Sequence, residues 1–218
     1  MNAVPGRFLT IEGIEGVGKS TQVARLSEGL NERGIAHVVT REPGGTPLAE
    51  RIREIVLSLS DNARGESMPP TAELLLMFAA RAVHLTNFVE PNLRAGRWVV
   101  CDRFIDATYA YQGGGRRLSM DHIRQLQTMV QGARLPDLTV LLDAPVEKAL
   151  ERAHRRNAGA AADRFESERA EFFERVRDAY RARAAAEPNR IAVIDARQSI
   201  DGVALQILQL LETRSWIS

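Results

Sequence analysis

The 218-residue sequence contains one cysteine, Cys101, and only two lysines, Lys19 and Lys148, among its 29 basic residues. A single cysteine excludes a disulfide framework and a multi-cysteine zinc site, and it fits a reducing cytosol. No two of the four histidines have the i, i+4 spacing of a helical metal site, so a zinc enzyme is not expected. The formal net charge is only +1, so no excess of positive charge favours nucleic acid or an anionic membrane. A phosphate ligand must therefore be bound by local geometry.

Long apolar runs are also missing. No segment approaches the roughly 18 consecutive apolar residues that a membrane span needs, and residues 1–6 lack the basic patch and apolar stretch of a signal peptide. We therefore expect a cytoplasmic protein without nucleic-acid or membrane partners. Hydrophobic residues make up 44% of the chain and charged residues 26%, which is the balance of a folded globular protein. Because no repeat and no linker rich in Pro, Gly or Ser divides the chain, residues 1–218 are expected to form one domain.

Short apolar runs typical of strands alternate with helical patterns. The runs are residues 8–11, 38–40, 98–101, 138–142 and 191–194. Between them apolar residues recur at helical spacing, as at Ile200, Val203 and Ile207. This alternation predicts an α/β fold with a parallel sheet and helices on both faces. A longer helix is expected from Pro70 past residue 88, with Pro91 interrupting it.

Residues 13–20 match the phosphate-loop pattern G-x-x-x-x-G-K-[ST], directly after the first expected strand and before a helical pattern. In such a loop the backbone N–H groups surround a phosphate, Lys19 adds a mobile positive charge, and Ser20 offers a hydroxyl to Mg²⁺. Neither lysine lies in the Asn-Lys-x-Asp tetrapeptide that reads guanine, which leaves an ATP-dependent transferase or an ATPase. The expected ATP-binding residues are Gly13, Ile14, Glu15, Gly16, Val17, Gly18, Lys19, Ser20 and Thr21.

Polar clusters follow the second and third expected strands. Residues 41–46 come directly after the second strand, and Asp102 and Arg103 end the third. Ligands of open α/β sheets bind at the carboxyl ends of the strands. An aspartate there can hold Mg²⁺ together with Ser20, and an arginine can bind a phosphate through two hydrogen bonds. The sequence therefore predicts a second anion site beside the phosphate loop.

Taken in order, these motifs resemble the bacterial thymidylate kinase family over essentially the whole chain. The matching segments are EGIEG at 12–16 with the phosphate loop, REPGGT at 41–46, FAAR at 78–81, DRF at 102–104 and AYQGGGR at 110–116. The resemblance implies a P-loop kinase fold with a five-stranded parallel sheet and a short lid over about 153–165. It also implies transfer of the γ-phosphoryl group of ATP, with Mg²⁺, to dTMP, and a homodimer.

The resemblance further implies residue roles on the acceptor side. Arg103 is expected to contact the acceptor phosphate, Asp102 to organise Mg²⁺, and Arg81 to read the thymine edge. The residue that covers the base is either Met77 or Phe78, and the resemblance does not decide between them. The implied dTMP-binding residues are Glu15, Arg41, Phe78, Arg81, Arg103, Thr108, Tyr111 and Gln112.

The variable positions of the phosphate loop, 14–17, contain no arginine that could stabilise the transferring phosphoryl group. Arginines instead flank residues 157–162, where Gly and Ala predominate, and the family resemblance includes a design with lid arginines. We expect Arg156 and then Arg164 to close over the phosphates. The expected catalytic residues are therefore Lys19, Arg103, Arg156 and Arg164.

The expected acceptor is itself a phosphate monoester, largely dianionic at neutral pH, so the reaction needs no general base. Two alternatives remain. One is a kinase for another nucleoside monophosphate or for a nucleoside, and a nucleoside hydroxyl would need a base. The other is an ATP-sensing module without turnover, which would have no use for a second anion site.

Overall fold

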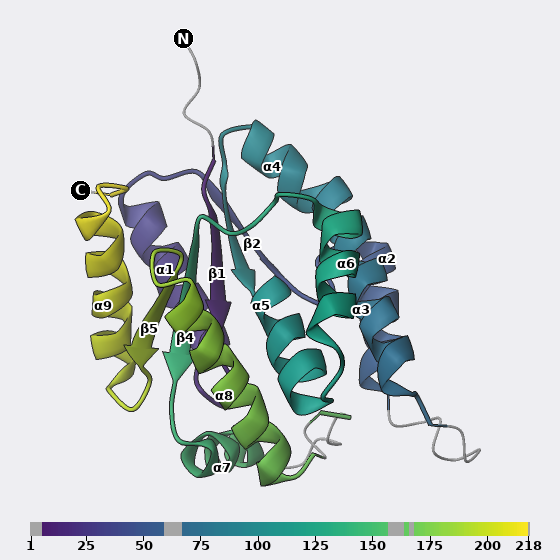
Figure 1. Cartoon of the computed structure of the whole chain (residues 1–218). Helices are drawn as coiled ribbons and strands as arrows, with labels where there is room; N and C mark the ends of the chain where they lie inside the picture. The colour runs from purple at the N-terminus through teal and green to yellow at the C-terminus, as the bar shows by residue number, and fades with distance from the viewer. Residues whose placement is uncertain (1–5, 59–66, 157–163, 166–167, 218) are drawn as a thin grey trace.

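The computed structural model describes residues 6–58, 67–156, 164–165 and 168–217, except for the side chain of Arg156. Its centre is a five-stranded parallel sheet in the order β2-β3-β1-β4-β5 (Figure 1). The strands are β1 (Phe8–Glu12), β2 (His37–Arg41), β3 (Trp98–Asp102), β4 (Leu138–Asp143) and β5 (Ile191–Asp195). The predicted α/β fold and its strands are confirmed.

At its carboxyl end, each strand extends one residue beyond the apolar run that predicted it, and this added residue is charged. These terminal residues are Glu12, Arg41, Asp102, Asp143 and Asp195. Because all strands are parallel, the charged ends lie along one edge of the sheet. Arg41 and Asp102 are direct neighbours across the β2–β3 pair. The sheet thereby gathers functional groups from distant parts of the sequence.

Helices cover both faces of the sheet (Figure 1). Leu9 and Ile11 of β1 pack in the core with apolar residues of α1 and α9, whereas Glu12 points to the other face and binds Tyr180 of α8. This alternation follows from the two-residue period of a strand. The helices are α1 (Lys19–Glu32), α2 (Pro47–Leu57), α3 (Pro70–His84), α4 (Glu90–Arg94), α5 (Ile105–Thr108), α6 (Met120–Gln131), α7 (Val146–Arg156), α8 (Ala170–Ala186) and α9 (Ile200–Thr213), with π-helical turns at Leu85–Val89 and Tyr109–Gly115.

The predicted interruption at Pro91 was wrong. The helix continues from α3 through the π-helical turn Leu85–Val89 into α4, so it runs unbroken over Pro70–Arg94. The wider turn places the Glu90 N–H against the carbonyl of Leu85, five residues back, and Pro91 then falls in the first turn of α4. Proline is tolerated in a first turn because its missing N–H would have no intrahelical partner there.

Among the described residues, this helix alone is long and apolar enough to span a membrane by length and composition, although the sequence contains no uninterrupted run. Half of its apolar window is buried inside the fold. Its polar residues Glu73, Arg81 and His84 are themselves buried and bind other elements of the protein. These contacts are typical of a core helix.

Candidate active site

The phosphate loop, residues 13–20, connects β1 to α1 as predicted. Gly16 has a φ of +76°, and a Cβ added there would lie 1.8 Å from the carbonyl oxygen of Ala149 in α7, so no other residue fits. Lys19 is buried and donates to the carbonyl of Ile14 at 2.8 Å, so its side chain lies along the loop. Burial, and then the positive charge of Arg103, lower the pKa of Lys19. An anion bound in the loop would oppose this shift, because it favours the charged form.

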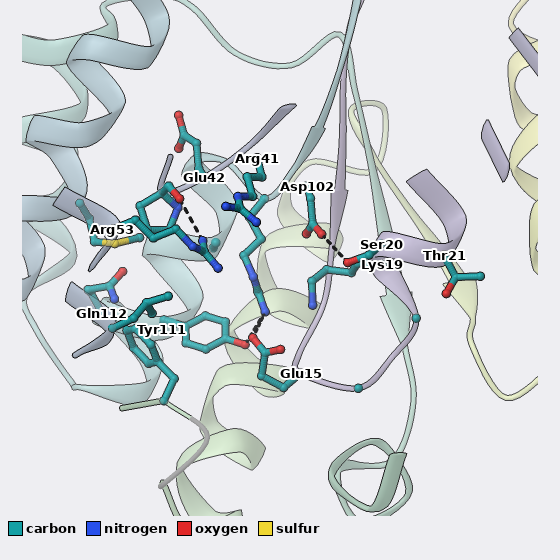
Figure 2. A pocket seen from close by; sticks show the side chains of 18 residues that line it. Glu15, Lys19, Ser20, Thr21, Arg41, Glu42, Arg53, Asp102, Tyr111 and Gln112 are labelled. Carbon is teal, nitrogen blue, oxygen red and sulfur yellow. Dashed lines mark hydrogen bonds and ion pairs between the residues drawn. The ribbon is translucent and has the colours of Figure 1, made fainter. Parts of the chain in front are cut away.

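Ser20, at the end of the phosphate loop, faces Asp102, the last residue of β3 (Figure 2). The Ser20 hydroxyl donates to Asp102 Oδ2 at 3.1 Å, while the buried Oδ1 has no hydrogen-bond partner within the described part of the chain. These are the hard oxygen ligands that Mg²⁺ prefers. No group of three or more His, Cys, Asp or Glu side chains able to hold a metal occurs among the described residues. The pair therefore fits Mg²⁺ that arrives with nucleotide phosphates and keeps several waters.

Arg103 directly follows β3 and has a φ of +71°, which is uncommon for a residue with a side chain. Its guanidinium donates to the Gly13 carbonyl at 2.9 Å, to the hydroxyls of Tyr111 at 3.0 Å and Tyr180 at 3.2 Å, and to the carboxylate of Glu15. Burial opposes the charge of Arg103, but Tyr111 and Glu15 outweigh it and raise its pKa above the ordinary value. A permanently charged, preorganised guanidinium thus lies beside the phosphate loop.

Glu12 and Tyr180 support this arginine from behind, and sequence reasoning assigned neither a role. The fully buried Glu12 carboxyl accepts the Phe104 N–H at 2.7 Å and the Tyr180 hydroxyl at 2.7 Å. Burial, and then the negative charge of Asp106, raise the pKa of Glu12 to about 7. The hydrogen bond from the Phe104 N–H fixes the peptide that follows Arg103, whose backbone is in the left-handed region. The sequence signals for Glu12 are its place in the EGIEG motif and its charge at the end of an apolar strand.

A cavity of about 370 Å³ opens between the phosphate loop and the ends of β2 and β3. Figure 2 shows Glu15 between Lys19 and Tyr111, with Gln112 on the far side. The structure thus brings together residues predicted from separate motifs. Those that line the cavity are Glu15, Gly16, Gly18, Lys19, Ser20, Thr21, Arg41, Asp102, Arg103, Tyr111 and Gln112.

Arg41 and Arg53 form the rim of the cavity on the β2–α2 side. Arg41 makes two hydrogen bonds to Glu50, at 2.9 and 3.3 Å, and these bonds lower the pKa of Glu50. Arg53 Nη1 donates to the carbonyl of Pro43 at 2.9 Å. Arg53 was missed by sequence reasoning because an arginine on the polar side of a helix usually marks a solvated face.

The structure corrects the placement of Phe78 and settles which of two neighbours faces the cavity. Phe78 packs in the core with Phe8 and Val99, and the Arg81 guanidinium lies 5.0 Å from its ring centre. Met77 lines the cavity. Adjacent helical residues point about 100° apart, so only one of the pair can face the ligand space. Phe78 fits the sequence motif, but its side chain lies on the face of α3 that packs into the core.

Arg81 and Thr108 lie behind the cavity wall rather than on it. The fully buried Arg81 donates through Nε to Glu42 at 2.8 Å and through Nη2 to Thr108 at 2.9 Å. Its Nη1 is buried and has no hydrogen-bond partner within the described part of the chain. Glu42 does line the cavity. Arg81 thus retains one unsatisfied donor, Nη1, whereas Thr108 accepts the hydrogen bond from Nη2.

Arg164 contacts two helices in the described structure. Its guanidinium contacts Glu73 of α3 and donates to the Val56 carbonyl at 3.1 Å, and its backbone N–H donates to Leu57 at 3.2 Å. The buried Glu73 carboxylate and the carbonyl end of α2 attract this cation. The closure of Arg164 over the phosphates stays a prediction. The other predicted lid cation, the Arg156 side chain, and residues 157–163 lie outside the described part of the structure.

The sheet order, the phosphate loop and the adjoining anion-binding arginine define a phosphotransferase of the P-loop kinase class. Residues 11–207 match the family model described as thymidylate kinase. The thymidylate kinase of Chromohalobacter salexigens is 56% identical over 214 residues, covering 97% of this chain and 99% of the relative. That of Thiobacillus denitrificans is 51% identical over 210 residues, covering 96% and 98%. The crystal structure of the Ehrlichia chaffeensis enzyme superposes with a TM-score of 0.76 at 32% identity, covering 95% of this chain and 100% of that one. The chain belongs to the thymidylate kinase family.

Proposed function

We propose that this cavity is where the chain, as a thymidylate kinase, transfers the γ-phosphoryl group of ATP to dTMP, giving dTDP and ADP. The observation that carries the assignment is the juxtaposition of two anion sites: Lys19 of the phosphate loop and Arg103 after β3 line one cavity. An ATPase or an ATP sensor needs only the first. A kinase whose acceptor is a phosphate needs both, held next to each other.

The donor phosphates bind to the backbone N–H groups of the phosphate loop and to Lys19. Ser20 and Asp102 would hold Mg²⁺, whose charge neutralises the donor phosphates when it is bound. Lys19 then exchanges its contact with the Ile14 carbonyl for a phosphate oxygen. Arg156, beyond the described side chains, supplies a further cation on this side of the site.

The acceptor phosphate binds to Arg103, which leaves its contact with Glu15. The Glu15 carboxylate faces the sugar hydroxyl, and the Tyr111 ring lies against the deoxyribose. Met77 covers the base, while the unsatisfied Nη1 of Arg81 donates to a thymine carbonyl. No side chain has to remove a proton, because the attacking oxygen belongs to a phosphate that is already anionic. Catalysis consists of alignment and charge neutralisation.

An assay of ADP release with and without nucleoside monophosphates tests this assignment. We expect rapid ADP release with dTMP and only slow release without it. Rates within about twofold with and without dTMP would contradict the kinase, since an acceptor must be consumed at each turnover. A higher kcat/KM for another nucleoside monophosphate would retain the phosphotransferase and replace the substrate.

We also propose that two copies associate through the exposed apolar side chains of α3 and α6, where Leu75 and Met129 are 52% and 75% exposed. A groove between these helices is lined by further apolar residues, among them Leu74, Leu118 and Leu126. Light scattering after size exclusion should give twice the monomer mass. Met129→Glu should lower that mass, and Leu205→Glu on the distant α9 (Figure 1), 56% exposed, should not.

Two further proposals concern the whole chain. We propose that it acts as one domain, with the lid at about 153–165 belonging to the same unit as the sheet. We also place the enzyme in the cytoplasm, because a single buried thiol, Cys101, needs no oxidising compartment. Cell fractionation tests the cytoplasmic location, and limited proteolysis tests whether the chain behaves as one domain.

A further inference from the structure

Glu73 is a fully buried carboxylate in α3 that no step of the proposed reaction uses. It accepts a hydrogen bond from Gln112 Nε2 at 2.7 Å and from Arg116 Nε at 3.1 Å, and it also contacts the Arg164 guanidinium. Arg116 in turn contacts Glu168. These contacts to an amide and two guanidinium groups hold the buried Glu73 carboxylate in one position.

The Glu73 carboxylate decides how the Gln112 amide is oriented. A carboxylate has only acceptors, so it can bind the NH₂ side of the amide and not the carbonyl side. The chemistry of Glu73 therefore assigns the two ends of this amide, which are otherwise hard to distinguish. As a consequence, Gln112 Oε1 points away from Glu73. It is buried and has no hydrogen-bond partner within the described part of the chain.

Gln112 lines the cavity, so its unsatisfied oxygen offers an acceptor to a bound base. Behind the neighbouring wall, the buried Nη1 of Arg81 is a donor without a hydrogen-bond partner within the described part of the chain. Thymine presents a ring N–H donor next to carbonyl acceptors, which complements this pair. Cytosine presents a ring nitrogen acceptor next to an amino donor, so both contacts would face groups of the same kind. Leaving buried polar groups unpaired is costly.

We propose that Glu73 is a specificity-determining positioning residue: by holding the Gln112 amide with its carbonyl toward the base, it selects bases that carry a ring N–H. The proposal rests on the proposed dTMP site and adds a residue that touches no substrate. Glu73 acts only through the amide of Gln112.

The test is Glu73→Gln, which keeps the side-chain shape but gives position 73 both a donor and an acceptor. The Gln112 amide is then free to turn over. We expect the ratio of kcat/KM for dTMP over dCMP to fall at least about tenfold, mainly through KM, with kcat for dTMP little changed. Glu168→Gln is the matched control, since it removes a carboxylate from the same Arg116 without touching Gln112, and its ratio should equal that of the native enzyme.

A double variant shows whether the effect passes through the amide. In a Gln112→Met background, Glu73→Gln should change the dTMP:dCMP ratio no further. An equal fall in that background, or no fall in the single variant, overturns the proposal. If the native enzyme does not use dTMP at all, the failure lies in the proposed function instead.

A second measurement uses the native protein, so it does not depend on whether a variant at position 73 folds. In the native protein, NMR should show the side-chain NH₂ protons of Gln112 protected from exchange with solvent. Addition of dTMP should shift the Gln112 side-chain carbonyl carbon, whereas dCMP should not. Exchange as fast as that of an exposed glutamine, such as Gln125 on α6, would overturn the assigned orientation.

Discussion

Glu12 should make the stability of this enzyme depend on pH near neutrality. Its pKa is about 7 in the folded protein, against an ordinary value of 4.5, because the carboxyl group is buried and faces the negative charge of Asp106. The folded state therefore binds this proton more tightly than the unfolded chain does. At about 1.4 kcal/mol per pKa unit, the shift corresponds to about 3 kcal/mol of unfolding free energy.

The sign follows from the direction of the shift. Because the folded-state pKa is raised, the contribution of Glu12 is complete below the unfolded pKa of 4.5 and is lost as the pH rises to about 7. Glu12→Gln cannot titrate, so the variant should lack this loss. Urea unfolding of both proteins from about pH 4 to about pH 8 should show the variant gaining about 3 kcal/mol relative to the native protein.

Two comparisons sharpen the experiment. Tyr180→Phe removes a hydrogen bond that lowers the pKa of Glu12, so the loss of stability should move to higher pH. Glu28→Gln changes an exposed carboxylate paired with Arg25, and its pH profile should match that of the native protein. Parallel profiles for the native protein and Glu12→Gln would refute the reasoning, because they would mean that Glu12 titrates alike in the folded and unfolded chains.

Three further predictions concern catalysis. Lys19→Ala should lower kcat at least about 100-fold while the thermal midpoint changes little, and near-normal turnover would remove Lys19 from the donor site. Arg156→Ala should lower kcat far more than dTMP affinity, whereas Arg103→Ala should weaken dTMP binding as well; steady-state kinetics and calorimetry separate the two, and a change in KM for dTMP alone would move Arg156 to the acceptor side. dUMP should be a detectable acceptor but a poorer one than dTMP, because one methyl group contributes only about 1 to 3 kcal/mol to discrimination between substrates. UMP should be poor because its 2′-hydroxyl meets the Tyr111 ring; a kcat/KM for UMP above that for dTMP would reject this pocket.

The phosphate loop could be predicted from sequence because its function is local. Residues 13–20 bind phosphate through their own backbone, so the glycine spacing, Lys19 and Ser20 contain most of the information. The strands could be predicted for a similar reason, because a central parallel strand is buried on both faces and leaves a continuous apolar run. Only the strand ends were misjudged, since charged residues such as Asp102 terminate the apolar pattern but still pair in the sheet.

The acceptor wall could not be predicted to the same detail. Met77 and Phe78 are both apolar and adjacent, and the phase of α3 against the sheet decides which one faces the cavity. The sequence predicts a lid role for Arg164, but it gives no sign of the contact that Arg164 makes with Glu73 of α3, far away in the sequence. Long-range ion pairs of this kind leave no local pattern in the chain.

The sequence by itself determined the fold class, the donor site and the order of the acceptor motifs, because strand burial and phosphate-loop chemistry depend on residues that are neighbours in the chain. Only the tertiary structure decided what supports the reacting groups: Glu12 and Tyr180 behind Arg103, and Glu73 behind Gln112. Each of these contacts joins elements that the sheet and helices bring together across at least 39 positions of sequence. These hydrogen bonds are stronger because they are buried away from water, and burial is a property of the packed fold rather than of any segment.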